Sequence, residues 1–224
     1  MKRNVKICIA LILTLVLSIS VLTGCSSGIS NYTAADLVQN NLDLIYLNKY
    51  TNDYLERVGL TKNEADQEYW DGIATEVAYF ADYFDIVLDS CDPSIETQIT
   101  EMYNKIYSYS KYEVGNQTKN GDTYLVELTV YPIDIISQVM DNDVDAFLDE
   151  WYDLGDSGEF DEATDEEVET RWAQMVIDMV SARISSIGYL EPETISVQVV
   201  KDSNGIYSIS QNDFERIDYL IIAY

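Results

Sequence analysis

The chain of 224 residues contains no histidine, and it has only 13 lysines and arginines against 40 aspartates and glutamates. Without histidine, every catalytic or metal-binding arrangement that depends on an imidazole is excluded, including Ser-His and Cys-His pairs and the histidine general base. The net charge of −27 argues against nucleic acid, because the phosphate backbone is bound by a basic surface. We therefore expect no nucleic-acid partner.

The first 24 residues have the pattern of a bacterial export signal. Three basic residues precede an apolar run over residues 7–21, which ends in Leu22, Thr23, Gly24 and Cys25. A short apolar run behind basic residues is typical of a secretory signal. Its last four residues resemble the lipobox of bacterial lipoproteins, in which the cysteine is acylated and the chain is cut just before it. The alternative is an uncleaved membrane helix, but such a run is short for a hydrocarbon core about 30 Å thick.

Cleavage before Cys25 would leave a lipidated tether over residues 25–33 and a domain over residues 34–224. The mature chain would have 10 bases against 40 acids, a balance of −30. A chain of this length buries about 70% of its unfolded surface, which is enough for one stable domain. These features predict a protein held on the outer face of the cell membrane by its N-terminal lipid.

The three cysteines leave no intramolecular disulfide in the mature chain. Cys8 is removed with the signal and Cys25 is acylated, so Cys91 has no partner of its own chain. With acidic neighbours and no histidine, Cys91 is best explained as a half-buried structural thiol.

The spacing of apolar residues predicts mainly helices, with two hairpins. Capping boxes at Thr61–Glu64 and Thr164–Glu167 mark two helix starts. The predicted helices cover residues 34–58, 61–89, 92–106, 133–154, 164–188 and a short segment after Asn212. Alternating residues around two Asn-Gly pairs predict hairpins over 111–131 and 194–210. A lone hairpin is marginal, so we expect an α+β fold with helices on one face of a curved antiparallel sheet built from both hairpins.

This layout resembles the small lipoproteins of clostridia and related Gram-positive bacteria. The resemblance depends on the lipobox at 22–25, the helical N-terminal half rich in tyrosine and acids, and the ending from Gly205-Ile206-Tyr207 to Asp213-Phe214. Their domains are similar to cystatin-like or nuclear-transport-factor-like folds, where a curved sheet wraps helices around a pocket. The resemblance implies a fold and a pocket but no catalytic residue and no cofactor.

The acidic segment 153–169 is a candidate cation site. Hard cations such as Ca²⁺ prefer six to eight oxygen ligands, so the segment could associate weakly with them through Asp156, Glu159, Asp161 and Glu162. A solvated loop leading into a helix is the preferred interpretation. Residues 141–145 imitate an EF-hand opening, but Ala146 and Tyr152 replace the glycine and glutamate that such a loop requires. We expect no dedicated metal site.

The 18 tyrosines allow two interpretations. Clusters at residues 46–54 and 103–112 could present aromatic surfaces to sugars or peptides. They also fall on helical stripes, which favours a core in which tyrosine hydroxyls lie at the rim.

The sequence favours a binding module over an enzyme. We expect a surface protein that binds a small molecule or a protein partner in a cleft between sheet and helices. The alternative is a hydrolase that uses two carboxylates on an envelope glycan. Two carboxyl groups about 5 to 9.5 Å apart between aromatic walls would favour the hydrolase, whereas an apolar interior would favour binding.

Overall fold

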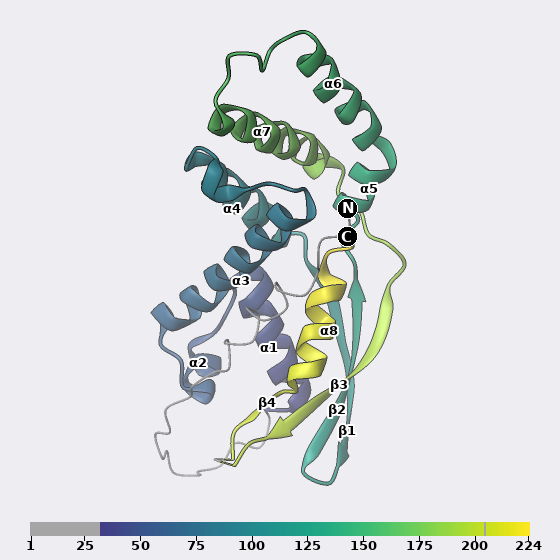
Figure 1. The fold of residues 1–224 in the computed structure, drawn as a ribbon. Helices are drawn as coiled ribbons and strands as arrows, with labels where there is room; N and C mark the ends of the chain where they lie inside the picture. Colours follow the sequence, from purple (N-terminus) through teal and green to yellow (C-terminus); the bar gives the residue numbers. More distant parts are fainter. Residues whose placement is uncertain (1–31, 204) are drawn as a thin grey trace.

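In the computed structural model, which describes residues 32–203 and 205–224, the two hairpins form one antiparallel sheet (Figure 1). The strand order is β1-β2-β3-β4. The strands are β1 (Lys111–Asn120), β2 (Thr123–Tyr131), β3 (Glu193–Lys201) and β4 (Tyr207–Ile209). The predicted α+β class and the joining of the hairpins are confirmed.

The sheet buries one face. Leu128 pairs with Ile195 and Val126 with Val197, and all four side chains are buried, while Glu127 between them is exposed. This alternation is the period-2 pattern of a strand with one covered face. Consequently, the helices gather on the side to which the valines and leucines point.

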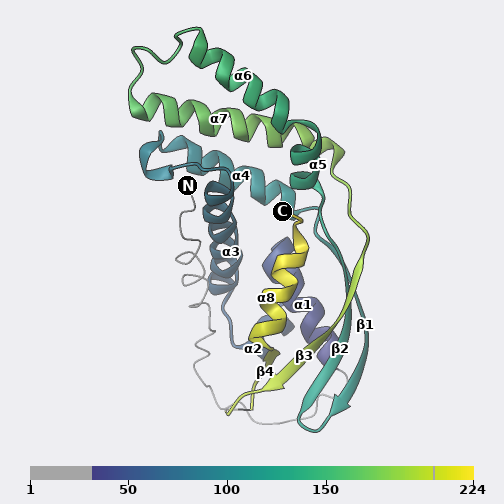
Figure 2. The ribbon, with the colours of Figure 1, turned by 45° about the vertical axis from the view of Figure 1, so that its right-hand side comes forward.

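Eight α-helices and two 3₁₀ turns complete the part of the chain that the structure describes. They are α1 (Ala34–Leu47), α2 (Asn52–Val58), α3 (Lys62–Tyr83), η3 (Leu88–Ser90), α4 (Ser94–Tyr107), α5 (Ile135–Asn142), α6 (Val144–Asp156), α7 (Asp165–Arg183), η4 (Ile184–Ser186) and α8 (Gln211–Ile221). Helices α1 and α8 pack on the sheet, α3 packs on α1 and α4, and α7 packs on α4, α5 and α6. Figure 2 shows that α5, α6 and α7 lie beyond the end of the sheet.

The prediction of one helix over residues 34–58 was wrong. Asn48 adopts the left-handed conformation with φ 49°, and its backbone N–H donates to carbonyls at the end of α1. Thr51 then caps α2, because its side chain accepts the backbone N–H of Tyr54. Local cap chemistry therefore overrides the continuous apolar spacing. Gly59, with φ 73°, ends α2 as predicted.

Two other predicted helices also differ from expectation, because one ends early and the other is broken into two. Helix α3 ends at Tyr83, not near residue 89, and Asp85 just beyond it has a positive φ of 54°. The predicted helix 133–154 breaks at Asp143, whose carboxylate accepts the Nε–H of Arg183 at 2.6 Å. The partner lies 40 residues away, so spacing within the segment does not reveal the break. Both predicted capping boxes are present.

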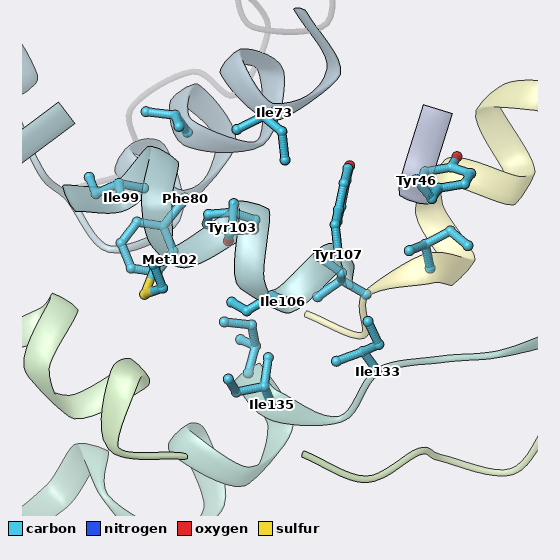
Figure 3. Packing of buried hydrophobic residues seen from close by; sticks show 14 of the residues in the cluster. Tyr46, Ile73, Phe80, Ile99, Met102, Tyr103, Ile106, Tyr107, Ile133 and Ile135 are labelled. Carbon is cyan, nitrogen blue, oxygen red and sulfur yellow. The ribbon is translucent and has the colours of Figure 1, made fainter. Parts of the chain in front are cut away.

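The main core lies between the sheet and the helices and continues through α3 and α4 toward α7. Figure 3 shows Phe80, Met102, Tyr103 and Ile106 packed in this region, and all four are buried. A second, smaller cluster under α2 is formed by four buried residues, Leu44, Tyr54, Leu55 and Ala65. Among the described residues, no helix is long and apolar enough to cross a membrane.

Candidate functional site

A cleft with a cavity volume of about 240 Å³ lies between α1, α2, β4 and the start of α8. It occupies the kind of position that the sequence predicts, between helices and the sheet. Its walls are mostly apolar and are formed by Leu37, Ile45, Val58, Leu60, Ile206, Ile209 and Phe214. An apolar cavity with a few converging polar groups is the usual form of a small-molecule site.

Turn chemistry at two places creates this cleft. The break after α1 allows α2 to lie near the first helix, where the Asn41 side chain contacts Tyr54. Strand β4 has only three residues, because the Ser210 side chain caps α8 by accepting the Asp213 N–H. In β4, Ile209 pairs with Val199, so its side chain points to the helix-covered face.

Asn41 and Tyr54 provide two of the polar groups in the cleft. The Asn41 Nδ2 donates to the Tyr54 hydroxyl oxygen at 3.4 Å. The Asn41 Oδ1 is buried and accepts no hydrogen bond from any described residue. The pKa of Tyr54 is raised to about 12, mainly by burial, with the bond from Asn41 opposing the rise and the nearby charge of Glu68 adding to it. The free Asn41 oxygen is therefore an acceptor without a donor.

Glu68 on α3 is the third polar group. Its side chain is partly buried, and no ion pair or hydrogen bond to it is found among the described residues. Burial, followed by the charges of Glu64 and Asp71, raises the pKa of Glu68 to about 7. A partly buried carboxyl without a donor is costly in its charged form. In the cleft, Asn41 Oδ1 and the Glu68 carboxylate therefore accept no hydrogen bond from any described residue.

A second cavity, of about 530 Å³, lies between α6 and α7 and is lined by Arg171, Met175, Met179 and Arg183 among others. It is larger than the cleft, but Arg183 there is already paired with Asp143. We place the candidate site in the cleft, because its walls are mostly apolar and Asn41 Oδ1 there is buried without a donor.

The two most buried carboxyl groups, Glu76 and Asp218, lie under tyrosines and line neither cavity. Tyr107 donates to Glu76 Oε1 at 3.0 Å, Tyr224 donates to Oε2 at 3.2 Å, and Tyr46 donates to Asp218 Oδ1 at 3.0 Å. Burial raises the pKa of Glu76 to about 7, with the Asp218 charge adding to the effect and the tyrosine bonds opposing it. In a chain with few bases, phenols supply the donors that these acids need.

The tyrosine pattern is therefore mainly structural. Tyr46, Tyr103 and Tyr107 are almost fully buried, and each hydroxyl bonds to an acid or to another tyrosine. Outside the main core, Tyr50 donates to Asp66 at 2.5 Å and Tyr112 donates to Asp43 at 2.7 Å. These contacts agree with the interpretation that places tyrosine rings in the core, but the Tyr107 hydroxyl bonds to the buried Glu76 and does not lie at the rim.

The predicted site residues form two groups, the lipobox and the acids proposed for weak cation binding. The lipobox residues Leu22, Thr23, Gly24 and Cys25 lie outside the described residues. The acids proposed for weak cation binding are exposed at the end of α6 and in the loop after it, at Asp156, Glu159, Asp161 and Glu162. Over the described ranges, no group of three or more acids or cysteines could hold a metal ion. Weak cation association stays a prediction.

Cys91 is buried, and its thiol donates to the Val87 carbonyl at 3.4 Å. Burial and then the charge of Glu169 raise the pKa of the thiol, which disfavours the reactive thiolate. This environment is that of a structural thiol.

The cleft residues Asn41, Tyr54 and Glu68 were not predicted as a site. They come from three different helices, and no motif joins them. The available signal was Asn41 beside the apolar stripe of Val38 and Leu42. A polar residue next to such a stripe is common on helices, so the signal alone is weak.

No protein-family model matches this chain, and no curated protein matches it. A crystal structure of ycdA, a candidate lipoprotein of Bacillus subtilis, has a similar fold, with a TM-score of 0.55 and 14% sequence identity. The match covers 85% of this chain and 56% of that chain, so this chain spans little more than half of that protein. Identity this low shows the fold alone. The likeness to cystatin-like and nuclear-transport-factor-like domains stays a prediction.

Proposed function

We propose that this chain is a lipid-anchored surface protein that binds a small molecule in the cleft between α1, α2, β4 and α8. The observation that carries the proposal is the mostly apolar cleft, in which Asn41 Oδ1 is buried without a donor and the partly buried Glu68 carboxylate accepts no bond from any described residue. Apolar walls supply binding free energy, and a few polar groups fix the orientation of a ligand.

The geometry of the cleft favours binding over hydrolysis. A hydrolase would need two carboxyl groups free to act on one substrate. The second carboxyl that lines the cleft, Asp202, already accepts the backbone N–H of Ile206 at 2.8 Å within the β3–β4 turn. The hydrolase remains the alternative from the sequence, and no feature of the cleft favours it.

The lipid anchor is supported by the lipobox at residues 22–25 and by a fold shared with a candidate lipoprotein. Cys25 lies seven positions before Tyr32, so at full extension the two residues are at most about 25 Å apart. Tyr32 packs against the small cluster under α2, beside Val58 and Leu60 of the cleft wall. An acylated Cys25 would therefore hold the cleft close to the membrane surface.

We expect the protein extracted from membranes to begin at Cys25 and to carry a diacylglycerol there. Cys25→Ala removes the only thiol at the lipobox, so it should abolish acylation, and two acyl chains are what makes such attachment stable. Mass spectrometry of the intact protein measures this. An unmodified Cys25, or a chain that still begins at Met1, would contradict the anchor.

Blocking the cleft should abolish ligand binding without unfolding the protein. In Ile209→Trp the larger ring should occupy the cavity, because Ile209 is partly buried in the cleft wall. The matched control is Leu190→Trp, at an exposed position outside the cleft. In a thermal-shift screen of small amphipathic molecules, we expect ligands that stabilise the wild type and the control but not Ile209→Trp. If every stabilising compound acts equally on all three, the cleft is not the site.

A further inference from the structure

We propose that the ligand of this cleft is an amphipathic monoamine, a short apolar body that carries one ammonium group. This inference rests on the proposed function, because it names the class of molecule that the cleft binds.

The oxygens in the cleft that receive no hydrogen bond are acceptors. Asn41 Oδ1 and the Glu68 carboxylate are both acceptors, and neither receives a bond from any described residue. The Tyr54 hydroxyl, close enough to Glu68 to sense its charge, already accepts a bond from Asn41. Tyr54 still has its own O–H to donate. The Glu68 carboxylate and Asn41 Oδ1 need donors, and an ammonium group has three donors and no acceptor.

The charged residues that line the cleft favour a cationic ligand. No lysine or arginine is among the described residues that line the cleft, whereas Glu68 and Asp202 are. The nearby Arg57 is paired with Asp53, with Nε at 2.7 Å from Oδ2. An anionic ligand would bring a second negative charge into a partly buried site, whereas a cation would compensate the carboxylate already there.

The size of the cleft and its apolar walls favour a small amphipathic ligand. The cavity of about 240 Å³ is small, and apolar side chains form most of its wall. A polyamine or another strongly hydrated cation would lose its water without gaining apolar contact. A six-carbon chain with one amine matches the apolar wall and brings a positive charge to the Glu68 carboxylate.

The test compares three probes with the same six-carbon body, hexylamine, hexanol and hexanoate. They are titrated at pH 8 into the mature chain, residues 25–224, made without acylation, and binding is followed by NMR chemical shifts. We expect hexylamine to bind about tenfold more tightly than hexanol, as one charge-assisted contact provides, and hexanoate to show no binding. Glu68→Gln should lose this preference for the amine and still bind hexanol as the wild type does.

Acidification gives a second readout. Lowering the pH from 8 to 6 should weaken hexylamine binding and leave hexanol binding unchanged, because Glu68 gains a proton in this range. The other titratable groups around Glu68 are Glu64 and Asp71 on α3, Tyr54 on α2 and Asp202 in the β3–β4 turn. Glu68→Gln should remove most of this pH dependence.

The outcomes separate the two claims. If hexanol or hexanoate binds as tightly as hexylamine, and Ile209→Trp abolishes that binding, the monoamine class is wrong and the cleft remains a ligand site. If none of the probes binds the wild type, or if Ile209→Trp binds them unchanged, both the class and the proposed site are wrong.

Discussion

Replacing Glu76 with glutamine is expected to stabilise the protein by about 3 kcal/mol at pH 8 and to change little near pH 4. Glu76 is only 9% exposed, and burial raises its pKa from 4.5 to about 7. The folded state therefore prefers the protonated acid. Glutamine is neutral at every pH and has nearly the same shape, so it avoids the cost of burying a charge.

The direction in which stability changes with pH follows from the raised pKa of Glu76. The protonated Glu76 contributes stability that is fully present below about pH 4.5, its value in the unfolded chain, and that is lost as the pH rises toward 7. Burial also raises the pKa of Asp218, which adds to the same trend. The wild type should thus lose stability from pH 5 to pH 8, and Glu76→Gln should lose less.

Urea unfolding of both proteins between pH 4 and pH 8 measures this difference. Glu101→Gln, at an exposed position on α4, is the control for loss of one negative charge. If Glu76→Gln is less stable than the wild type at pH 8, the carboxylate is stabilising in its charged form, and the account of the buried network is wrong.

Phe80→Ala is expected to lower the free energy of unfolding by about 3–5 kcal/mol, the usual cost of removing a large buried ring. Phe80 is 0% exposed and lies beside Tyr103 in the core (Figure 3). Its ring centroid is 4.7 Å from that of Phe84 and 5.6 Å from that of Tyr103. The surrounding helices cannot close fully around the missing volume, so a cavity remains.

Tyr219→Ala is the matched control, because this aromatic side chain is 79% exposed. Its stability should remain within about 0.5 kcal/mol of the wild type. Phe80→Leu should fall between the two and keeps the comparison informative if the alanine variant does not fold. Equal losses for Phe80→Ala and Tyr219→Ala in the same denaturation assay would mean that Phe80 does not lie in the main core.

The helix starts and turns that depend only on neighbouring residues could be predicted from the sequence. The capping boxes at Thr61 and Thr164 and the glycine turn at Gly121 depend on residues within four positions of one another. The breaks at Asn48 and Asp143 were not predicted. The first needs a left-handed asparagine that apolar spacing does not reveal, and the second lies at Asp143, which pairs with Arg183 from another helix.

The site was less predictable than the fold. A cleft between sheet and helices was expected, but its acceptors come from α1 and α3, and its wall includes residues of β4 and α8. Only the packing of these distant segments leaves Asn41 Oδ1 buried without a donor. The sequence likewise placed tyrosines on helical stripes but did not predict that their hydroxyls would bond to buried acids such as Glu76.

A crystal structure of the mature chain grown at pH 8 with hexylamine tests the central claim most directly. The account predicts the amine in the cleft, with its nitrogen within hydrogen-bond distance of the Glu68 carboxylate and its carbon chain against Leu37 and Ile209. A cleft whose side chains have closed over the cavity, with the amine bound elsewhere or not at all, would contradict the account.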